Sequence, residues 1–206
     1  MPSVLITAST FSHIMNFHLP YLRRFRELGW QVHVACGGAM RDIPFADVTT
    51  VLPLEKKMSS PANFRAAKLL RGMMEREHYD LVIAHTSLAA FFTRWAARGM
   101  HDRPGIINVM HGYLFTDETP AAKKLLLTKA ELLTAPQTDL VLTMNAWDTR
   151  WAVEHCAAAA SSWPAAAWPG PSVRRIPPDR AGRCPPPQDP ACPAWPAASP
   201  PPPGSG

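Results

Sequence analysis

The sequence predicts an α/β fold built as a doubly wound, Rossmann-like parallel sheet. Short apolar segments alternate with amphipathic segments from residue 4 to about residue 155. Some of the apolar segments, such as Leu81 to Ala84, run without polar interruption, as is typical of strands covered by helices on both faces. Strand and helix patterns alternate throughout, and that order predicts parallel strands joined by crossover helices.

The first forty residues predict a strand, a loop, a helix and a second strand. Pro20 fits the first turn of that helix, where its missing N–H costs nothing, and Gly29 fits its end. In an open parallel sheet, the loop after the first strand lies where ligands bind. We expect the strand at 4–6, the loop at 7–13, the helix from about 16 to 28, and the next strand around 32–34.

The remaining elements follow from apolar runs and helix signals. Ser60-Pro61 combines a capping residue with a proline and predicts the start of a long helix. We expect further strands at 49–52, 81–84, 106–110 and 139–144, and further helices at 88–98, 121–133 and from 145 onward.

The last 50 residues differ in composition from the rest of the chain. Residues 157–206 hold 15 of the 23 prolines and contain no Leu, Met, Phe, Tyr, Lys or Glu. Such a segment buries too little apolar surface to offset the entropy of ordering it. We therefore expect one folded domain at 1–155 and a disordered low-complexity tail at 156–206.

Composition and motifs exclude several function classes. The net charge is +5, of which the tail supplies +2, and no nucleic-acid-binding motif accompanies it. GxGxxG, GxxxxGK[ST] and GxSxG are all absent, which argues against dinucleotide binding, P-loop chemistry and an α/β-hydrolase. No histidine or cysteine spacing matches a metal site. With neither a secretory signal nor a long apolar run, a reducing cytoplasm is the expected compartment.

Polar residues follow three of the predicted strands and should meet at one rim of the sheet. They are Ser9 to His18 after the first strand, His85 and Thr86 after the fourth, and His111 and Gly112 after the fifth. Neutral imidazole both donates and accepts hydrogen bonds, so these histidines are candidates for ligand contacts. A strand-capping role is the alternative for each. Asp117 and Glu118 follow closely and could act as a base, although surface positions suit them better.

Several motifs together resemble the N-terminal part of the family 4 glycosyltransferases of bacteria, in the group that assembles capsule, exopolysaccharide and lipopolysaccharide. The motifs are SHIMNFHLPY at 12–21, LGWQVHVA at 28–35, YDLVIAHT at 79–86, VMHGY at 109–113 and DLVLTMN at 139–145. They occur in the family's order over about 150 residues.

The resemblance implies the GT-B architecture, in which two Rossmann-like domains face each other across a cleft. The N-terminal domain mainly binds the acceptor, a glycan or lipid-linked saccharide, and the C-terminal domain binds the nucleotide-sugar. Family members are typically retaining and need no metal ion or other cofactor. The resemblance makes His111 the catalytic candidate and the following residues substrate-binding candidates: Ser9, Ser12, His13, Asn16, His18, His85, Thr86 and Gly112.

The sequence departs from this family after about residue 155. No second Rossmann pattern follows, and the donor-binding E-x7-E motif is absent. We therefore expect this chain to be inactive alone, and a frameshift or truncation would explain the tail. The alternatives are an acceptor-binding subunit that pairs with a separate donor-binding chain, and a sugar-nucleotide epimerase-like fragment.

Peripheral membrane contact is a further expectation, because basic residues stand beside the apolar run Leu125–Leu127. These are Lys123, Lys124 and Lys129, and a solvated helix face explains them as well.

Overall fold

The computed structural model describes residues 1–156 and 159–162, and the predicted disordered tail falls almost entirely outside the described residues. The described part forms one parallel sheet flanked by helices. Its elements are β1 (Ser3–Ala8), α1 (Phe11–Phe17), α2 (Leu19–Glu27), β2 (Gln31–Gly37), β3 (Val48–Leu52), α3 (Pro61–Glu77), β4 (Leu81–His85), α4 (Ser87–Ala96), β5 (Gly105–Met110), α5 (Ala121–Thr134), the 3-10 helix η1 (Ala135–Gln137), β6 (Leu140–Thr143), α6 (Ala146–His155) and β7 (Ala159–Ser162).

The strand order confirms the predicted doubly wound sheet. The strands lie in the order β3-β2-β1-β4-β5-β6-β7, and every neighbouring pair is parallel. The chain runs outward from β1 to β3 and then returns to the other side of β1 with β4. The order therefore reverses between β1 and β4, and ligands bind at such a reversal in open α/β sheets.

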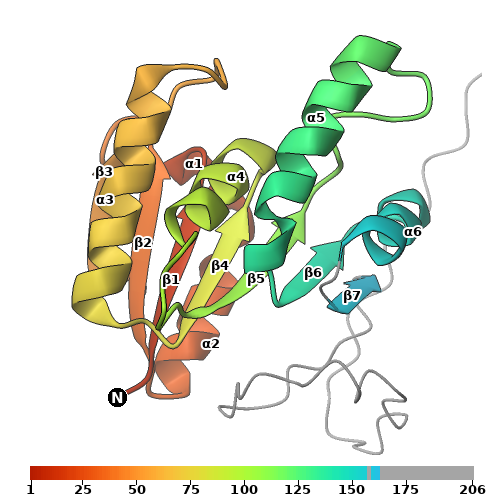
Figure 1. Cartoon of the computed structure of the whole chain (residues 1–206). Coiled ribbons are helices and arrows are strands. Elements are labelled where there is room, and N and C mark those ends of the chain that lie inside the picture. Colours follow the sequence, from red (N-terminus) through yellow and green to blue (C-terminus); the bar gives the residue numbers. More distant parts are fainter. Residues whose placement is uncertain (157–158, 163–206) are drawn as a thin grey trace, which may run out of the picture. The chain divides into compact units, whose positions relative to one another are not determined.

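The helices cover the two faces of the sheet separately (Figure 1). Ile14 of α1 and Leu22 of α2 pack on one face against a core that includes Val4 of β1. On the other face, Leu70 of α3 and Phe92 of α4 join a second core. Burial of both faces explains the apolar character of central strands such as β4, whereas β3 at the edge is partly exposed and carries two threonines.

The segment after β1 is more helical than the sequence predicts. The prediction of a loop at 7–13 is wrong, because α1 already begins at Phe11, with the Thr10 side chain accepting a hydrogen bond from the His13 N–H. The predicted single helix is divided at His18, which ends α1 and precedes α2. Pro20 explains the division, since a proline cannot donate the backbone hydrogen bond that would continue α1.

The predicted helix signals at Ser60-Pro61 and Gly29 are confirmed. Ser60 caps α3 through a bond from the Ala62 N–H, with Pro61 in the first turn. Gly29 and Gly99 adopt positive φ angles of 79° and 69° where α2 and α4 have ended. Cys36 is fully buried, and burial raises the pKa of its thiol to about 12, as befits a core residue.

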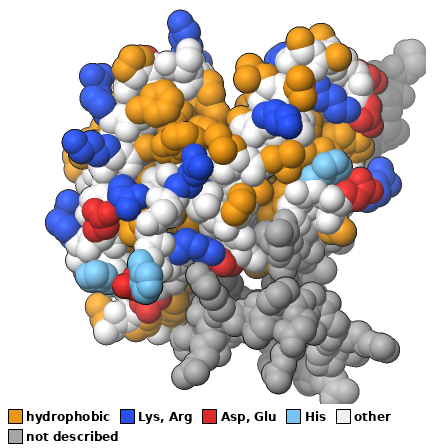
Figure 2. All heavy atoms as spheres, in the orientation of Figure 1, with side chains coloured by type: hydrophobic (Ala, Val, Ile, Leu, Met, Phe, Trp, Pro, Cys, Tyr) orange, Lys and Arg blue, Asp and Glu red, His pale blue; other side chains and the backbone are white. Residues whose placement is uncertain are grey.

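The helix α5 is less regularly amphipathic than its sequence predicts. Its buried residues are Glu131 and Thr134, whereas the Leu125 and Leu126 side chains are 60% and 70% exposed. Figure 2 shows hydrophobic and basic side chains interspersed over the face that carries α3, α4 and α5. Within the described residues, no helix has the length and apolar character needed to cross a membrane.

Candidate functional site: a histidine cluster at the strand ends

Four histidines converge where the strand order reverses. His13 and His18 come from the α1 segment after β1, His85 is the last residue of β4, and His111 follows β5. Because β1, β4 and β5 are neighbours in the sheet, their carboxyl ends bring these side chains to one place. The predicted meeting of the three strand ends at one rim is confirmed.

The cluster is tight. The rings of His18 and His85 lie 3.8 Å apart between centroids, and those of His13 and His111 lie 4.8 Å apart. The His111 Nε2 atom lies 3.5 Å from the His85 Nδ1 atom. One ring nitrogen from each of the four lies within 4.8 Å of the others.

Burial keeps these histidines neutral. It lowers the pKa of all four, most strongly for His85 and to about 4 for His18. Charge repulsion from neighbouring imidazoles lowers the pKa further for His13, His18 and His85. At neutral pH each ring therefore offers one lone pair and one N–H to a ligand.

Two of the ring nitrogens have no partner. The Nε2 atoms of His13 and His18 are buried, and neither makes a hydrogen bond within the described part of the protein. His18 is only 6% exposed. A buried polar atom without a partner is costly, so these atoms point to a ligand that would satisfy them.

Ser9 and Thr86 connect the ends of β1 and β4 beside the cluster. Their hydroxyl oxygens lie 2.6 Å apart, and the Ser9 N–H donates to the Thr86 Oγ1 atom at 3.1 Å. Thr86 has φ 63°, a backbone conformation that is strained for a residue with a branched side chain. The Ser9–Thr86 contact thus fixes the start of α4 and, with it, the position of His85.

The other predicted residues are less involved. Ser12 and Asn16 occupy exposed positions on α1. Gly112 has φ 120°, which lets the chain turn directly after His111. Asp117 and Glu118 are exposed, as surface residues should be, and Asp117 is bonded to Lys124 and to the Trp147 Nε1 atom.

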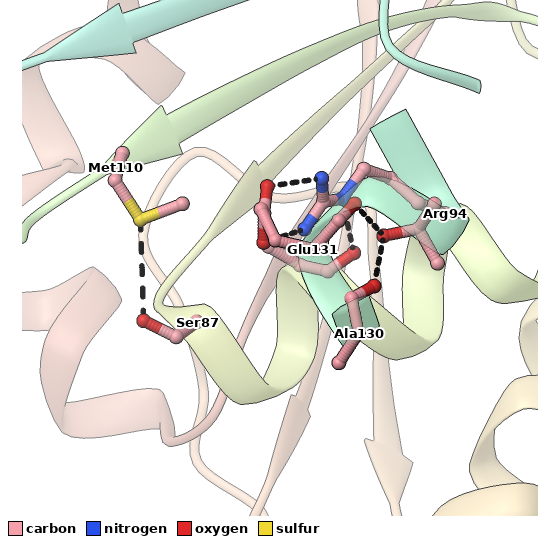
Figure 3. A network of polar contacts seen from close by, with 7 residues as sticks. Ser87, Arg94, Met110, Ala130 and Glu131 are labelled. Carbon is pink, nitrogen blue, oxygen red and sulfur yellow. Dashed lines mark hydrogen bonds and ion pairs between the residues drawn. The ribbon is translucent and has the colours of Figure 1, made fainter. Parts of the chain in front are cut away.

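Sequence reasoning misses the ion pair that supports the site. Arg94 of α4 and Glu131 of α5 form two hydrogen bonds of 2.6 and 2.9 Å, and Arg94 is 1% exposed (Figure 3). The Ser87 hydroxyl, at the start of the same helix, points to the Met110 sulfur at 4.0 Å. The sequence does not predict this pair, because Arg94 and Glu131 are 37 residues apart and each looks like a solvated residue of its own helix.

His33 is the other missed residue. Its alternation with Val32 and Val34 predicts a solvated side chain on the polar face of the strand, and this is wrong: it is 4% exposed, with Nδ1 2.7 Å from the Tyr79 hydroxyl. A hollow of about 740 Å³ lies beside this pair, between α3 and the edge strands, and basic residues such as Arg65 and Lys68 line it. It holds none of the predicted site residues. The buried Nε2 atom of His33 also lacks a hydrogen-bond partner within the described residues, whereas two such nitrogens, those of His13 and His18, lie together at the histidine cluster.

The fold is a doubly wound, Rossmann-like sheet with polar side chains gathered at its strand ends, and comparison with known proteins identifies the family. The model of Glycosyltransferase Family 4 matches residues 21–171. This chain therefore belongs to Glycosyltransferase Family 4, and its described part is the N-terminal, Rossmann-like domain of the GT-B fold.

A relative in Bacillus subtilis (strain 168), described as the glycosyltransferase EpsD, is 31% identical over 147 residues. That match covers 70% of this chain and 38% of EpsD, so the chain spans well under half the length of this relative.

Solved structures share the fold at low identity. Sucrose-phosphate synthase from Thermosynechococcus elongatus gives a TM-score of 0.57 at 10% identity, over 81% of this chain and 49% of that one. A UDP-N-acetylglucosamine 2-epimerase from Listeria monocytogenes gives 0.55 at 13% identity, over 74% and 41%. MnaA of S. aureus, solved with UDP, gives 0.50 at 15% identity, over 75% and 40%.

Proposed function

We propose that this chain supplies the acceptor-side domain of a glycosyltransferase that moves a sugar from a nucleotide-sugar to a glycan or lipid-linked acceptor in bacterial surface polysaccharide synthesis. The histidine cluster carries the proposal. In a family 4 chain, neutral imidazoles gathered at the reversal of strand order suit the recognition of sugar hydroxyls. The EpsD relative and the UDP-bound neighbour support a nucleotide-sugar as the donor.

In this proposal His111 is the residue nearest to the chemistry. It is exposed while His18 and His85 are buried, so it is the member of the cluster that an incoming sugar meets first. His13, His18 and His85 hold it in place and offer further hydrogen bonds to hydroxyls. Transfer with retention of configuration, a hexosyl donor and no requirement for a metal ion are what we expect from the resemblance to the family.

We also propose that the 206 residues alone do not catalyse transfer. Holding donor and acceptor together supplies a large share of the rate in such reactions, on the order of 7–11 kcal/mol. This chain matches 38% of EpsD, and its sequence has no E-x7-E motif for the donor. A donor-binding domain would have to complete the cleft.

The compartment in this proposal is the cytoplasm, with contact at the inner face of the membrane. The exposed Leu125 and Leu126 of α5, next to the exposed Lys123, support such contact, because apolar and basic side chains together bind anionic lipid surfaces.

A transfer assay tests the proposal. The full chain is mixed with labelled nucleotide-sugars and a lipid-linked acceptor, with and without the product of the neighbouring gene, in the presence of a chelator. We expect glycosylated acceptor only with the second protein, and its loss in the His111→Asn variant. Turnover by the chain alone would overturn the proposed inactivity, and failure to form product in every mixture would overturn the transferase proposal.

The same assay tests the epimerase alternative. Two solved epimerases share this fold with TM-scores of 0.55 and 0.54. If the chain converts a nucleotide-sugar to its epimer without any acceptor, the epimerase reading replaces the transferase reading.

A further inference from the structure

We propose that His13, His18, His85 and His111 form a binding site for one divalent transition-metal ion, with Zn²⁺ as the expected ion. This inference goes beyond the proposed function and does not depend on it. It rests on the distances within the cluster, on the kind of ligand atom and on the unpartnered ring nitrogens.

The distances are close to those of a four-coordinate site. Zinc binds histidine nitrogen at about 2.0–2.1 Å, so tetrahedral geometry places the ligand nitrogens about 3.3 Å apart. In this chain the four nitrogens already lie within 4.8 Å of one another, and His85 Nδ1 and His111 Nε2 lie 3.5 Å apart. Ring rotations that move each nitrogen by about 1 Å would complete the geometry.

The ligand atoms select the class of metal. Among the residues that the structure describes, no carboxylate or thiol joins the four imidazoles. Imidazole suits zinc, copper, nickel and iron, whereas magnesium and calcium prefer oxygen ligands. A metal ion binds the unprotonated nitrogen of an imidazole ring.

A metal ion would also satisfy the unpartnered atoms. The Nε2 atoms of His13 and His18 are buried without a hydrogen-bond partner in the described chain. His18 and His85 are each 6% exposed and are held by the junction of two helices and by a central strand. His111 is exposed and precedes Gly112, so it can move to close the site.

The sequence could not signal this site. His13 and His18 are five residues apart, and the other two ligands come from the ends of β4 and β5. Zinc motifs are recognised by short spacings between paired ligands, and only the sheet order brings these four together. The same four residues face the proposed sugar site, so a bound metal ion and a bound sugar would compete for His111.

Metal titration of the full chain tests the proposal. After treatment with a chelator and its removal, Zn²⁺ is titrated in a calorimeter without nucleotide-sugar or acceptor. We expect one tightly bound equivalent, and more than about 100-fold weaker binding in His85→Asn and His111→Asn, because even an indirect ligand partner changes affinity by about 10–100-fold. His111→Asn removes an exposed side chain, so it reports on the site even if a buried variant fails to fold.

Matched variants separate this site from incidental binding. His101→Asn removes an imidazole whose side chain is 98% exposed, outside the cluster, and should leave the affinity unchanged. Binding of Co²⁺ should give the visible bands of a tetrahedral nitrogen site without thiolate charge transfer. The proposal is overturned if no equivalent binds, if His111→Asn binds Zn²⁺ as tightly as the original chain, or if a thiolate band shows that cysteines hold the ion. None of these results bears on sugar transfer, which is assayed with chelator.

Discussion

Arg94 and Glu131 form a buried, bidentate ion pair that joins α4 to α5. The Nη1–Oε1 and Nη2–Oε2 distances are 2.6 and 2.9 Å, and the Arg94 Nε atom donates to the Ala90 carbonyl at 3.1 Å. The two side chains are 1% and 11% exposed. Because α4 begins beside His85 and Thr86, this pair helps to fix the helix that carries one side of the histidine cluster.

Removing one partner of this pair should be strongly destabilising. We expect Glu131→Ala to lower the free energy of unfolding by about 3–5 kcal/mol, because it leaves the Arg94 charge buried and unpaired. The double variant Arg94→Met/Glu131→Leu should recover most of that loss, since apolar residues can replace a buried pair. Urea denaturation measures both.

An exposed ion pair provides the control. Glu75 pairs with Arg71 on the surface of α3, with side chains 53% and 39% exposed, and Glu75→Ala should lose less than about 1 kcal/mol. If Glu131→Ala costs no more than Glu75→Ala, the buried pair does not hold α4 and α5 together.

Two buried asparagines should respond in opposite directions to the same substitution. Asn108 of β5 is fully buried, and both of its amide atoms lack a partner within the described residues. Asn108→Val should therefore raise the free energy of unfolding by about 1–2 kcal/mol, because it removes an unpaired polar group from the core. Thermal or urea unfolding of the full chain gives the value.

Asn63 is the matched comparison. It is also fully buried, but it accepts a bond from the Glu55 N–H at 2.8 Å and donates to the Glu55 and Lys57 carbonyls at 3.1 and 2.9 Å. Asn63→Val should lower the free energy of unfolding by about 2 kcal/mol or more, since three backbone groups lose their partner. Equal losses in the two variants would mean that Asn108 is as well bonded as Asn63.

Sequence patterns predict the architecture because strands and helices have strong local signals. The apolar runs at 81–84 and 106–110 give β4 and β5 nearly to the residue, and Ser60-Pro61 gives the start of α3. The parallel sheet alone predicts that the residues after β1, β4 and β5 lie along one edge of the sheet. The α1 segment is harder, because its polar and small residues at 7–13 predict a loop, and only Pro20 marks the break between α1 and α2.

The tertiary contacts of polar side chains could not be predicted. The sequence predicts a solvated His33, whereas in the structure β2 places it against the Tyr79 hydroxyl. Glu131 likewise reads as a surface residue of α5 until Arg94 is found opposite it. The histidines of the rim are visible in the sequence, but their close approach depends on β4 lying directly between β1 and β5.

The metal-free protein should lose stability as the pH falls from about 6.5 to about 4. The pKa of His18 is lowered to about 4, first by burial and then by the charges of His13 and His111. As the pH falls, the unfolded chain therefore takes up a proton on His18 before the folded chain does. The neutral His18 stabilises the folded protein fully above pH 6.5, and this contribution is lost as the pH falls towards 4. His18 alone should account for about 3 kcal/mol between these limits.

The His18→Asn variant isolates this effect. Carboxylates also titrate in this range, but they are common to both proteins, so the difference in slope reports the histidine. Urea denaturation in chelator at a series of pH values should show a shallower decline for His18→Asn than for the original chain. Parallel curves would show that His18 is protonated as readily in the folded protein as in the unfolded one.

The central claim is that sugars bind at the histidine cluster, and imidazole NMR of the full chain tests it directly. Its eight histidines include four in the cluster, while His33, His78, His101 and His155 serve as internal references. With chelator present, a glycan acceptor should shift the ring-nitrogen signals of His13, His18, His85 and His111 and leave the references unchanged. A shift at His33, beside the hollow between α3 and the edge strands, with the cluster unmoved, would contradict the account.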